Sequence, residues 1–169
     1  MAETLDSALP PEVQDRADTV LDLADDRGLK LATAESCTGG LLAALLTDVE
    51  GRSHVFERGF VVYSEDAKCD LLGIARAKVE SCGAVSEEVA LEMALGAVRR
   101  SRADIALAIT GFAGPAGPGE EEGLVHFAYA RRTGAVRHRE EHFGPIGRQG
   151  VRIEALNVGL ELLEEAIRA

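Results

Sequence analysis

Residues 29–51 read LKLATAESCTGGLLAALLTDVEG, and this stretch decides the fold that the sequence predicts. Residues 29–34 are a short apolar run that fits a buried strand, and residues 41–49 form a strongly apolar helix that Gly51 ends. A turn of small residues, 36–40, separates the two, and its glycines permit backbone conformations that other residues avoid. A buried strand that turns directly into an apolar helix predicts an α/β domain.

The segments on either side of this stretch continue the alternation of helices and strands. Ser64 and Ser86 are each followed by acidic residues and an apolar pattern, which is typical of helix N-caps. Two alternating segments around Thr133 and Gly134 predict an antiparallel hairpin. The other predicted helices are residues 12–27, 64–73, 86–101 and 149–167, and the other predicted strands are residues 56–64, 103–110, 124–132 and 136–143.

The order of these elements predicts an α/β fold: a single three-layer α/β/α domain with a mixed sheet. The antiparallel hairpin lies near the C-terminus, and a closing C-terminal helix completes the domain. The length of 169 residues suits one domain with a full core. Residues 1–11 are polar and contain Pro10 and Pro11, so we expect a flexible leader there and the domain at residues 12–169.

The composition restricts the classes of partner. A net charge of −11 argues against a protein that binds nucleic acid unspecifically, but it leaves room for a small anionic ligand. The three cysteines show no metal-ligand spacing and fit a reduced, intracellular protein. The acidic start is unlike a signal peptide, and no apolar run reaches the length of a membrane span. We therefore expect a cytoplasmic protein that binds neither nucleic acid nor membrane.

Two predicted strands end at Gly-rich turns, one at Ser36 and one at Gly111. Ligands of open α/β sheets bind at the carboxyl ends of strands, so both turns are expected to line one pocket. Ser36 lies beside helix N–H groups that have no partner within the helix, and these donors suit a developing oxyanion or an anion. The alternative is that Ser36 or Thr38 only caps the helix.

A serine nucleophile requires a base, and the histidines do not provide one. No sequence context ties any of them to Ser36, and no His, Asp or Glu group has the spacing of metal ligands. Lys68 is a candidate base because burial favours the neutral amine, and Tyr63 could reach the same pocket across the strand-to-helix turn. The alternative for Lys68 is an ordinary solvated helix residue.

Two further features fit substrate binding. The loop TGFAGPAGPG at residues 110–119 can turn several N–H groups inward, and Thr110 could donate its hydroxyl. Arg148 and Arg152 share one face at the start of the last helix and could bind a phosphate. The alternatives are a plain surface loop and a pair of solvated arginines.

Together these motifs resemble the CinA C-terminal domain family, whose stand-alone members are nicotinamide-nucleotide amidohydrolases. The resemblance covers residues 12–168, nearly the whole chain. The matching blocks are AESCTGG at 34–40, FERGFVVYS with Lys68 at 56–68, GAVSEEV at 83–89, TGFAGPAG at 110–117 and the closing Arg-x-x-x-Arg.

The resemblance implies hydrolysis of the carboxamide of nicotinamide mononucleotide, giving nicotinate mononucleotide and ammonia, without a metal or organic cofactor. It implies that Ser36 is the nucleophile and that Lys68 and Tyr63 take and relay its proton. It also implies a small-molecule nucleotide substrate. The residues expected to bind that substrate are Thr38, Gly39, Gly40, Thr110, Gly111, Ala113, Gly114, Arg148 and Arg152. Of the two arginines, Arg152 is the closer match to the family pattern.

The sequence departs from the family pattern in three places. Glu65 adds a carboxylate near Lys68 that favours its charged form, and Glu120–Glu122 would repel a phosphate if they faced the pocket. The segment 143–152 carries one added residue before Arg148. An amidase for another small amide, or a non-catalytic module that binds a nucleotide or a protein, therefore stays open. A homodimer is possible.

Overall fold

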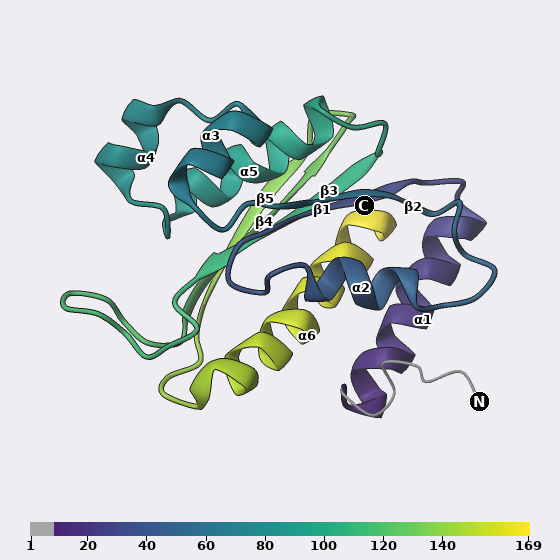
Figure 1. Ribbon diagram of the computed structural model, residues 1–169. Helices are drawn as coiled ribbons and strands as arrows, with labels where there is room; N and C mark the ends of the chain where they lie inside the picture. The colour runs from purple at the N-terminus through teal and green to yellow at the C-terminus, as the bar shows by residue number, and fades with distance from the viewer. Residues whose placement is uncertain (1–8) are drawn as a thin grey trace.

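A five-stranded sheet forms the centre of the computed structural model, which describes residues 9–169 (Figure 1). The strand order is β2-β1-β3-β4-β5, with β1 parallel to β2 and β3, and with β3, β4 and β5 antiparallel. The sheet is therefore mixed, as the sequence predicts. The strands are β1 Leu31–Glu35, β2 Phe56–Val61, β3 Ile105–Gly111, β4 Leu124–Arg131 and β5 Val136–His142.

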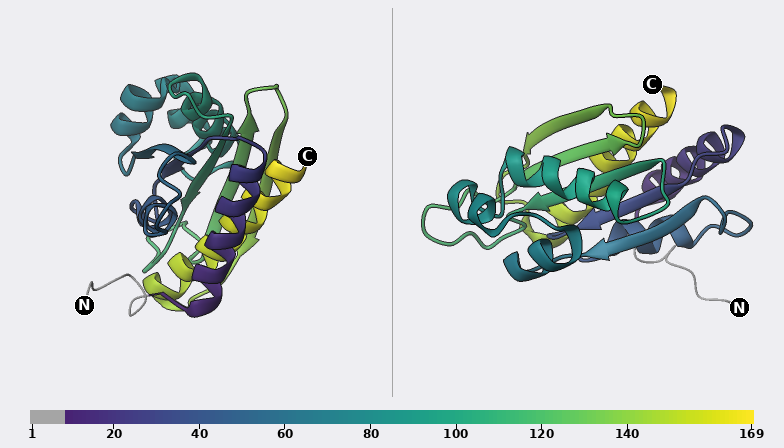
Figure 2. Two further views of the ribbon diagram at one scale, coloured as in Figure 1. Left: turned by 90° about the vertical axis from the view of Figure 1, so that its right-hand side faces the viewer. Right: turned by 90° about the horizontal axis from the view of Figure 1, so that it is seen from above.

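Helices cover both faces of the sheet, which confirms the predicted three-layer α/β/α architecture. Figure 2 shows α1 and α6 side by side on one face and the α3–α5 group on the other. The first layer is α1 Pro11–Asp26, α2 Leu41–Thr47 and α6 Gly147–Arg168, and the second is α3 Glu65–Leu72, α4 Arg76–Cys82 and α5 Glu87–Arg99. None of the helices within residues 9–169 is long and apolar enough to cross a membrane.

The two faces of the sheet differ in side-chain size, because successive residues of a strand point to opposite faces. On β3, Leu107 and Ile109 pack towards α1, α2 and α6, whereas Ala106 and Ala108 pack towards α5. Because the side chains on the second face are small, α5 packs close to the sheet. Thr110 continues that row of alanines and so meets the segment that leads into α5.

The helix caps inferred from the sequence are present. Ser64 Oγ accepts a hydrogen bond from Ala67 N at 3.0 Å at the start of α3, and Ser86 Oγ accepts one from Val89 N at 3.3 Å at the start of α5. The hairpin of β4 and β5 is also as predicted. The Ser64 cap fixes where α3 begins and so sets the position of Lys68, one turn further on.

Two features of the ends and connections differ from the sequence-based expectation. The helix α4 was missed, because RAKVESC has only one fully buried residue, Val79, and has no side-chain cap. Of the predicted leader at residues 1–11, residues 1–8 lie outside the described part of the chain. Leu9 is buried, and Pro11 already opens α1.

Candidate active site

Ser36 and Lys68 form a buried hydrogen-bonded pair. Ser36 follows the last residue of β1, and its N–H continues the sheet by donating to Ile109 O at 2.9 Å. Lys68 comes from the first turn of α3, and its side chain is only 1% exposed. Its Nζ lies 3.0 Å from Ser36 Oγ and 3.0 Å from Val62 O. The structure therefore brings together the predicted nucleophile and the predicted base.

Burial favours the neutral form of Lys68. Removal from water lowers the pKa of its ammonium below the ordinary value of 10.5, and this is the largest influence on the group. The negative charge of the Glu65 carboxylate acts in the opposite direction and is weaker. The carboxylate of Glu65 therefore moderates the lowered pKa of Lys68 without reversing it.

A pocket of about 270 Å³ opens in front of this pair. Both Gly-rich turns line it, with Ser36 and Cys37 from one and Gly111 to Pro115 from the other, as their places at strand ends predict. Arg148 and Glu120 supply the charged groups of the wall besides Lys68. The predicted nucleophile, the predicted base and an accessible cavity thus meet at the carboxyl ends of β1 and β3.

Tyr63 and Thr110 both line the pocket but in different ways. The Tyr63 side chain is 63% exposed, and among residues 9–169 no hydrogen bond joins its hydroxyl to Ser36 or Lys68. Thr110 is fully buried, and its Oγ1 donates to Ala84 O at 2.8 Å. The Thr110 hydroxyl therefore donates its proton to the backbone and not into the pocket. Tyr63 lies at the mouth of the pocket.

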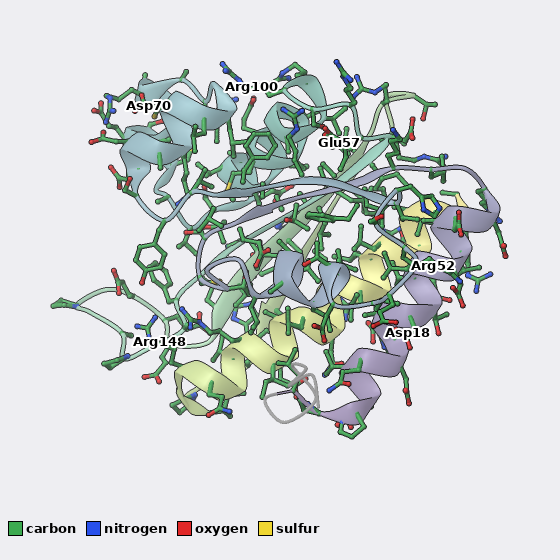
Figure 3. All side chains as sticks on the ribbon, turned by 45° about the vertical axis from the view of Figure 1, so that its right-hand side comes forward. Asp18, Arg52, Glu57, Asp70, Arg100 and Arg148 are labelled. Atoms are coloured by element: carbon green, nitrogen blue, oxygen red, sulfur yellow. The ribbon has the colours of Figure 1, made fainter. Side chains whose placement is uncertain are left out.

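The two arginines at the start of α6 have separate positions. Arg148 lines the Ser36 pocket, and its Nη2 donates to Gly114 O at 2.6 Å. Figure 3 shows it reaching from the start of α6 towards the Gly-rich loop. Arg152 is not part of that lining, and its Nε donates to Cys37 O at 2.9 Å. Of these two arginines, Arg148 is therefore the one that lines this pocket.

The three glutamates of the Gly-rich loop do not act together. Glu120 lines the pocket, and its Oε2 accepts from Gly117 N at 2.8 Å. Glu121 pairs with His142, and Glu122 packs against Gly114. Of the three glutamates, only Glu120 therefore lines the pocket.

Thr38, Gly39 and Gly40 belong to the turn after Ser36 and Cys37 and form no part of the pocket wall. Thr38 Oγ1 donates to Glu35 Oε2 at 2.6 Å. The same carboxylate accepts from the N–H groups of Leu42 and Ala43 at the start of α2. The expectation that these N–H groups are free for an oxyanion is therefore wrong for two of them. Glu35 was not singled out from the sequence, because it is not part of a recognisable spacing of catalytic or metal-binding residues.

Cys37 and the histidines take no part in the Ser36–Lys68 pair. Burial raises the pKa of the Cys37 thiol to about 12, so the thiol stays protonated beside the nucleophile. His126 bonds to His138 at 2.9 Å, and His54 and His142 pair with carboxylates. Within residues 9–169, no group of three or more His, Cys, Asp or Glu residues could hold a metal ion.

Solved structures share this fold closely. The competence/damage inducible protein CihA from Agrobacterium tumefaciens superposes with a TM-score of 0.92 at 42% identity, and the match covers 100% of both chains. A CinA superfamily protein from Escherichia coli superposes with a TM-score of 0.86 at 31% identity, covering 98% of this chain and 99% of that one.

Sequence relatives give the same grouping. The chain is 46% identical over 139 residues to the nicotinamide-nucleotide amidohydrolase PncC of Escherichia coli strain K12. The match covers 81% of this chain and 84% of the relative. It is 51% identical over 118 residues to a CinA-like protein of Chlorobium luteolum, of which it covers 27%. The family described as CinA C-terminal domain matches residues 13–167. This chain therefore belongs to the CinA C-terminal domain family.

Proposed function

We propose that this protein hydrolyses the carboxamide of nicotinamide mononucleotide to nicotinate mononucleotide and ammonia. The observation that carries the proposal is the buried pair of Ser36 Oγ and Lys68 Nζ at 3.0 Å, at the back of an accessible pocket. The activity in the name of the Escherichia coli relative, which matches over most of both chains, indicates the substrate.

The first half of the reaction acylates Ser36. The neutral Lys68 amine accepts the hydroxyl proton of Ser36, and Oγ attacks the carbon of the carboxamide. The C–N bond then breaks, and the departing nitrogen takes a proton from the Lys68 ammonium and leaves as ammonia. Tyr63 lies at the mouth of the pocket without a hydrogen bond to Ser36 or Lys68, so its part in a proton relay requires a bound molecule between its hydroxyl and Lys68.

The second half of the reaction releases the acid. Water enters the space that ammonia has left, and Lys68 again accepts a proton as the water attacks the acyl carbon. The bond between that carbon and Ser36 Oγ breaks, and the proton returns from Lys68 to Oγ. The pair is then restored with Lys68 neutral.

The pocket wall provides the contacts that orient a nucleotide. Arg148 is the cation placed to bind the phosphate, since a guanidinium donates charge-assisted hydrogen bonds to such oxygens. The loop from Gly111 to Gly114 brings backbone close to the ligand, and Thr110 fixes the loop base through Ala84. Arg148 and the loop backbone hold the substrate, and Thr110 supports the loop, while Ser36 and Lys68 carry out the chemistry.

The proposal is tested by measuring ammonia release from nicotinamide mononucleotide with the purified protein. Ser36→Ala and Lys68→Ala are the controls, and we expect each to lose activity by a factor of ~10³ or more. Turnover that does not exceed that of the two variants would contradict the proposal. Tight binding of the nucleotide without turnover would instead indicate a non-catalytic binding module.

Glu120 favours one second candidate, an amidase whose substrate carries no phosphate. Its carboxylate lines the same pocket as Arg148 and offsets part of the positive charge there. Nicotinamide riboside has the same carboxamide without the phosphate, so it separates the two candidates. A higher kcat/KM for the riboside than for the mononucleotide would support the second candidate.

A further inference from the structure

Glu35 is a fully buried carboxylate directly before the nucleophile. It ends β1, and its side chain points to the start of α2. Thr38 Oγ1 donates to Oε2 at 2.6 Å, Leu42 N donates to Oε2 at 3.0 Å, and Ala43 N donates to Oε1 at 2.8 Å. A buried carboxylate needs such donors, because burial without partners is strongly unfavourable.

These contacts span the whole turn that carries Ser36. The chain reverses at Gly39 and Gly40, whose φ values of 62° and 94° lie in the left-handed region. No side chain caps α2 from the conventional N-cap position, which Gly40 occupies. The Glu35 carboxylate therefore takes the place of the missing cap and ties the start of α2 to the end of β1.

The main chain of Glu35 also contributes to the position of Lys68. Val62 N donates to Glu35 O at 2.8 Å, and Val62 O in turn accepts from Lys68 Nζ at 3.0 Å. One residue thus connects both partners of the catalytic pair: its side chain fixes the turn of Ser36, and its carbonyl holds the segment that orients Lys68.

We propose that the Glu35 carboxylate is a positioning residue that holds Ser36 Oγ within hydrogen-bond distance of Lys68 Nζ. It does not line the pocket and so acts through Ser36 rather than on the substrate. The kinetic test of this inference rests on the proposed function, whereas the structural test does not.

Glu35→Gln is the informative variant, because glutamine keeps the size but has one acceptor oxygen and no charge. At least one of the three donors then loses its partner, and the turn is free to shift. We expect kcat for nicotinamide mononucleotide to fall about tenfold or more, with KM within about twofold, since substrate contacts are unchanged.

Val20→Ala is the matched control, because Val20 is fully buried in α1 and does not line the pocket. It lowers stability without touching the turn of Ser36. We expect it to lower the Tm while kcat per folded molecule stays within about twofold of the parent. The inference is overturned if Glu35→Gln keeps kcat within twofold, or if Val20→Ala lowers kcat as much.

A crystal structure of Glu35→Gln tests the inference without a substrate. We expect the distance from Ser36 Oγ to Lys68 Nζ to exceed 3.5 Å, the limit of a hydrogen bond. A retained distance near the parent value of 3.0 Å overturns the inference. If the parent protein releases no ammonia from the nucleotide but Ser36 is displaced in Glu35→Gln, the result supports the inference and refutes only the proposed function.

Thr38→Val provides a second variant if Glu35→Gln does not fold. It removes one donor from the carboxylate and keeps the charge and both helix N–H contacts. We expect a smaller fall in kcat, about threefold, with KM unchanged and with a matching but smaller displacement of Ser36. An unchanged kcat together with an unchanged position of Ser36 overturns the inference.

Discussion

Lys68 Nζ lies 3.0 Å from Ser36 Oγ although the two residues are 32 positions apart in the chain. Ser36 is placed by the parallel ladder of β1 with β3, and Lys68 by the capped start of α3. The pair is therefore a product of the sheet order, which sets β2 and the turn into α3 beside β1.

Lys68→Arg is expected to abolish hydrolysis although the positive charge is kept. A guanidinium cannot lose its proton in a protein, so no base remains to accept the proton of Ser36. We expect kcat to fall by a factor of ~10³ or more, measured as ammonia release from nicotinamide mononucleotide. Circular dichroism and the Tm show whether the variant is folded, and activity above a tenth of the parent value would contradict the role of Lys68 as base.

Glu65→Gln is expected to shift the pH dependence of kcat/KM to lower pH. The rate rises with pH as Lys68 in the free enzyme loses its proton, and burial places this rise below the ordinary lysine pKa of 10.5. The negative charge of Glu65 raises the pKa of Lys68, so its removal lowers that pKa and increases the neutral fraction at a given pH. Rate profiles of both proteins test this, and a shift to higher pH would contradict it.

Most of the fold follows from periodicity and from turn chemistry. The strands that become β1 and β3 are rich in apolar residues because both of their faces are covered, and the hairpin follows from alternation around Thr133 and Gly134. The short helix α4 could not be predicted, because a segment with one fully buried residue has no apolar stripe.

The place of the candidate site at the carboxyl ends of two strands was predictable, but the contacts between its side chains were not. Ser36 and Lys68 were nominated from their contexts and from the family resemblance, but their contact depends on tertiary packing. The structural role of Glu35 could not be predicted, because a glutamate at a strand end is usually expected at the surface. Only the folded structure shows the three donors that bind its carboxylate. Arg148 and Arg152 are equivalent by spacing, and only the packing of α6 separates them.

Arg148→Ala and Arg152→Ala are expected to have different kinetic effects. Arg148 lines the pocket, so its loss removes a charge-assisted contact and should raise KM for nicotinamide mononucleotide about tenfold or more. Arg152 holds Cys37 O beside the nucleophile, so its loss should lower kcat with a smaller change in KM.

Nicotinamide riboside provides the control for the two arginines, since it lacks the phosphate. Arg148→Ala should change KM for the riboside little, whereas Arg152→Ala should lower kcat for both compounds. A larger rise in KM for the mononucleotide from Arg152→Ala than from Arg148→Ala would show that the phosphate contacts Arg152 instead.

Glu120→Gln is expected to improve the binding of a phosphate-bearing substrate. Glu120 is the one carboxylate of its loop that lines the pocket, and glutamine can still accept from Gly117 N. Loss of the negative charge removes repulsion, so KM for nicotinamide mononucleotide should fall about threefold at low salt, and less at high salt. KM values measured at two ionic strengths test this, and an unchanged KM at both would show that Glu120 does not influence the phosphate.

Cys37 is expected to resist alkylation in the folded protein despite its place beside Ser36. Its side chain is 4% exposed, and burial raises the pKa of the thiol to about 12. Only the thiolate reacts with iodoacetamide, so at pH 8 the other two cysteines, which are less buried, should be modified first. Peptide mass spectrometry over time measures the order of modification, and the same reaction in urea should reach all three thiols. Rapid modification of Cys37 in the native protein would show that the turn after Ser36 opens to solvent, which the contacts of Glu35 and Arg152 argue against.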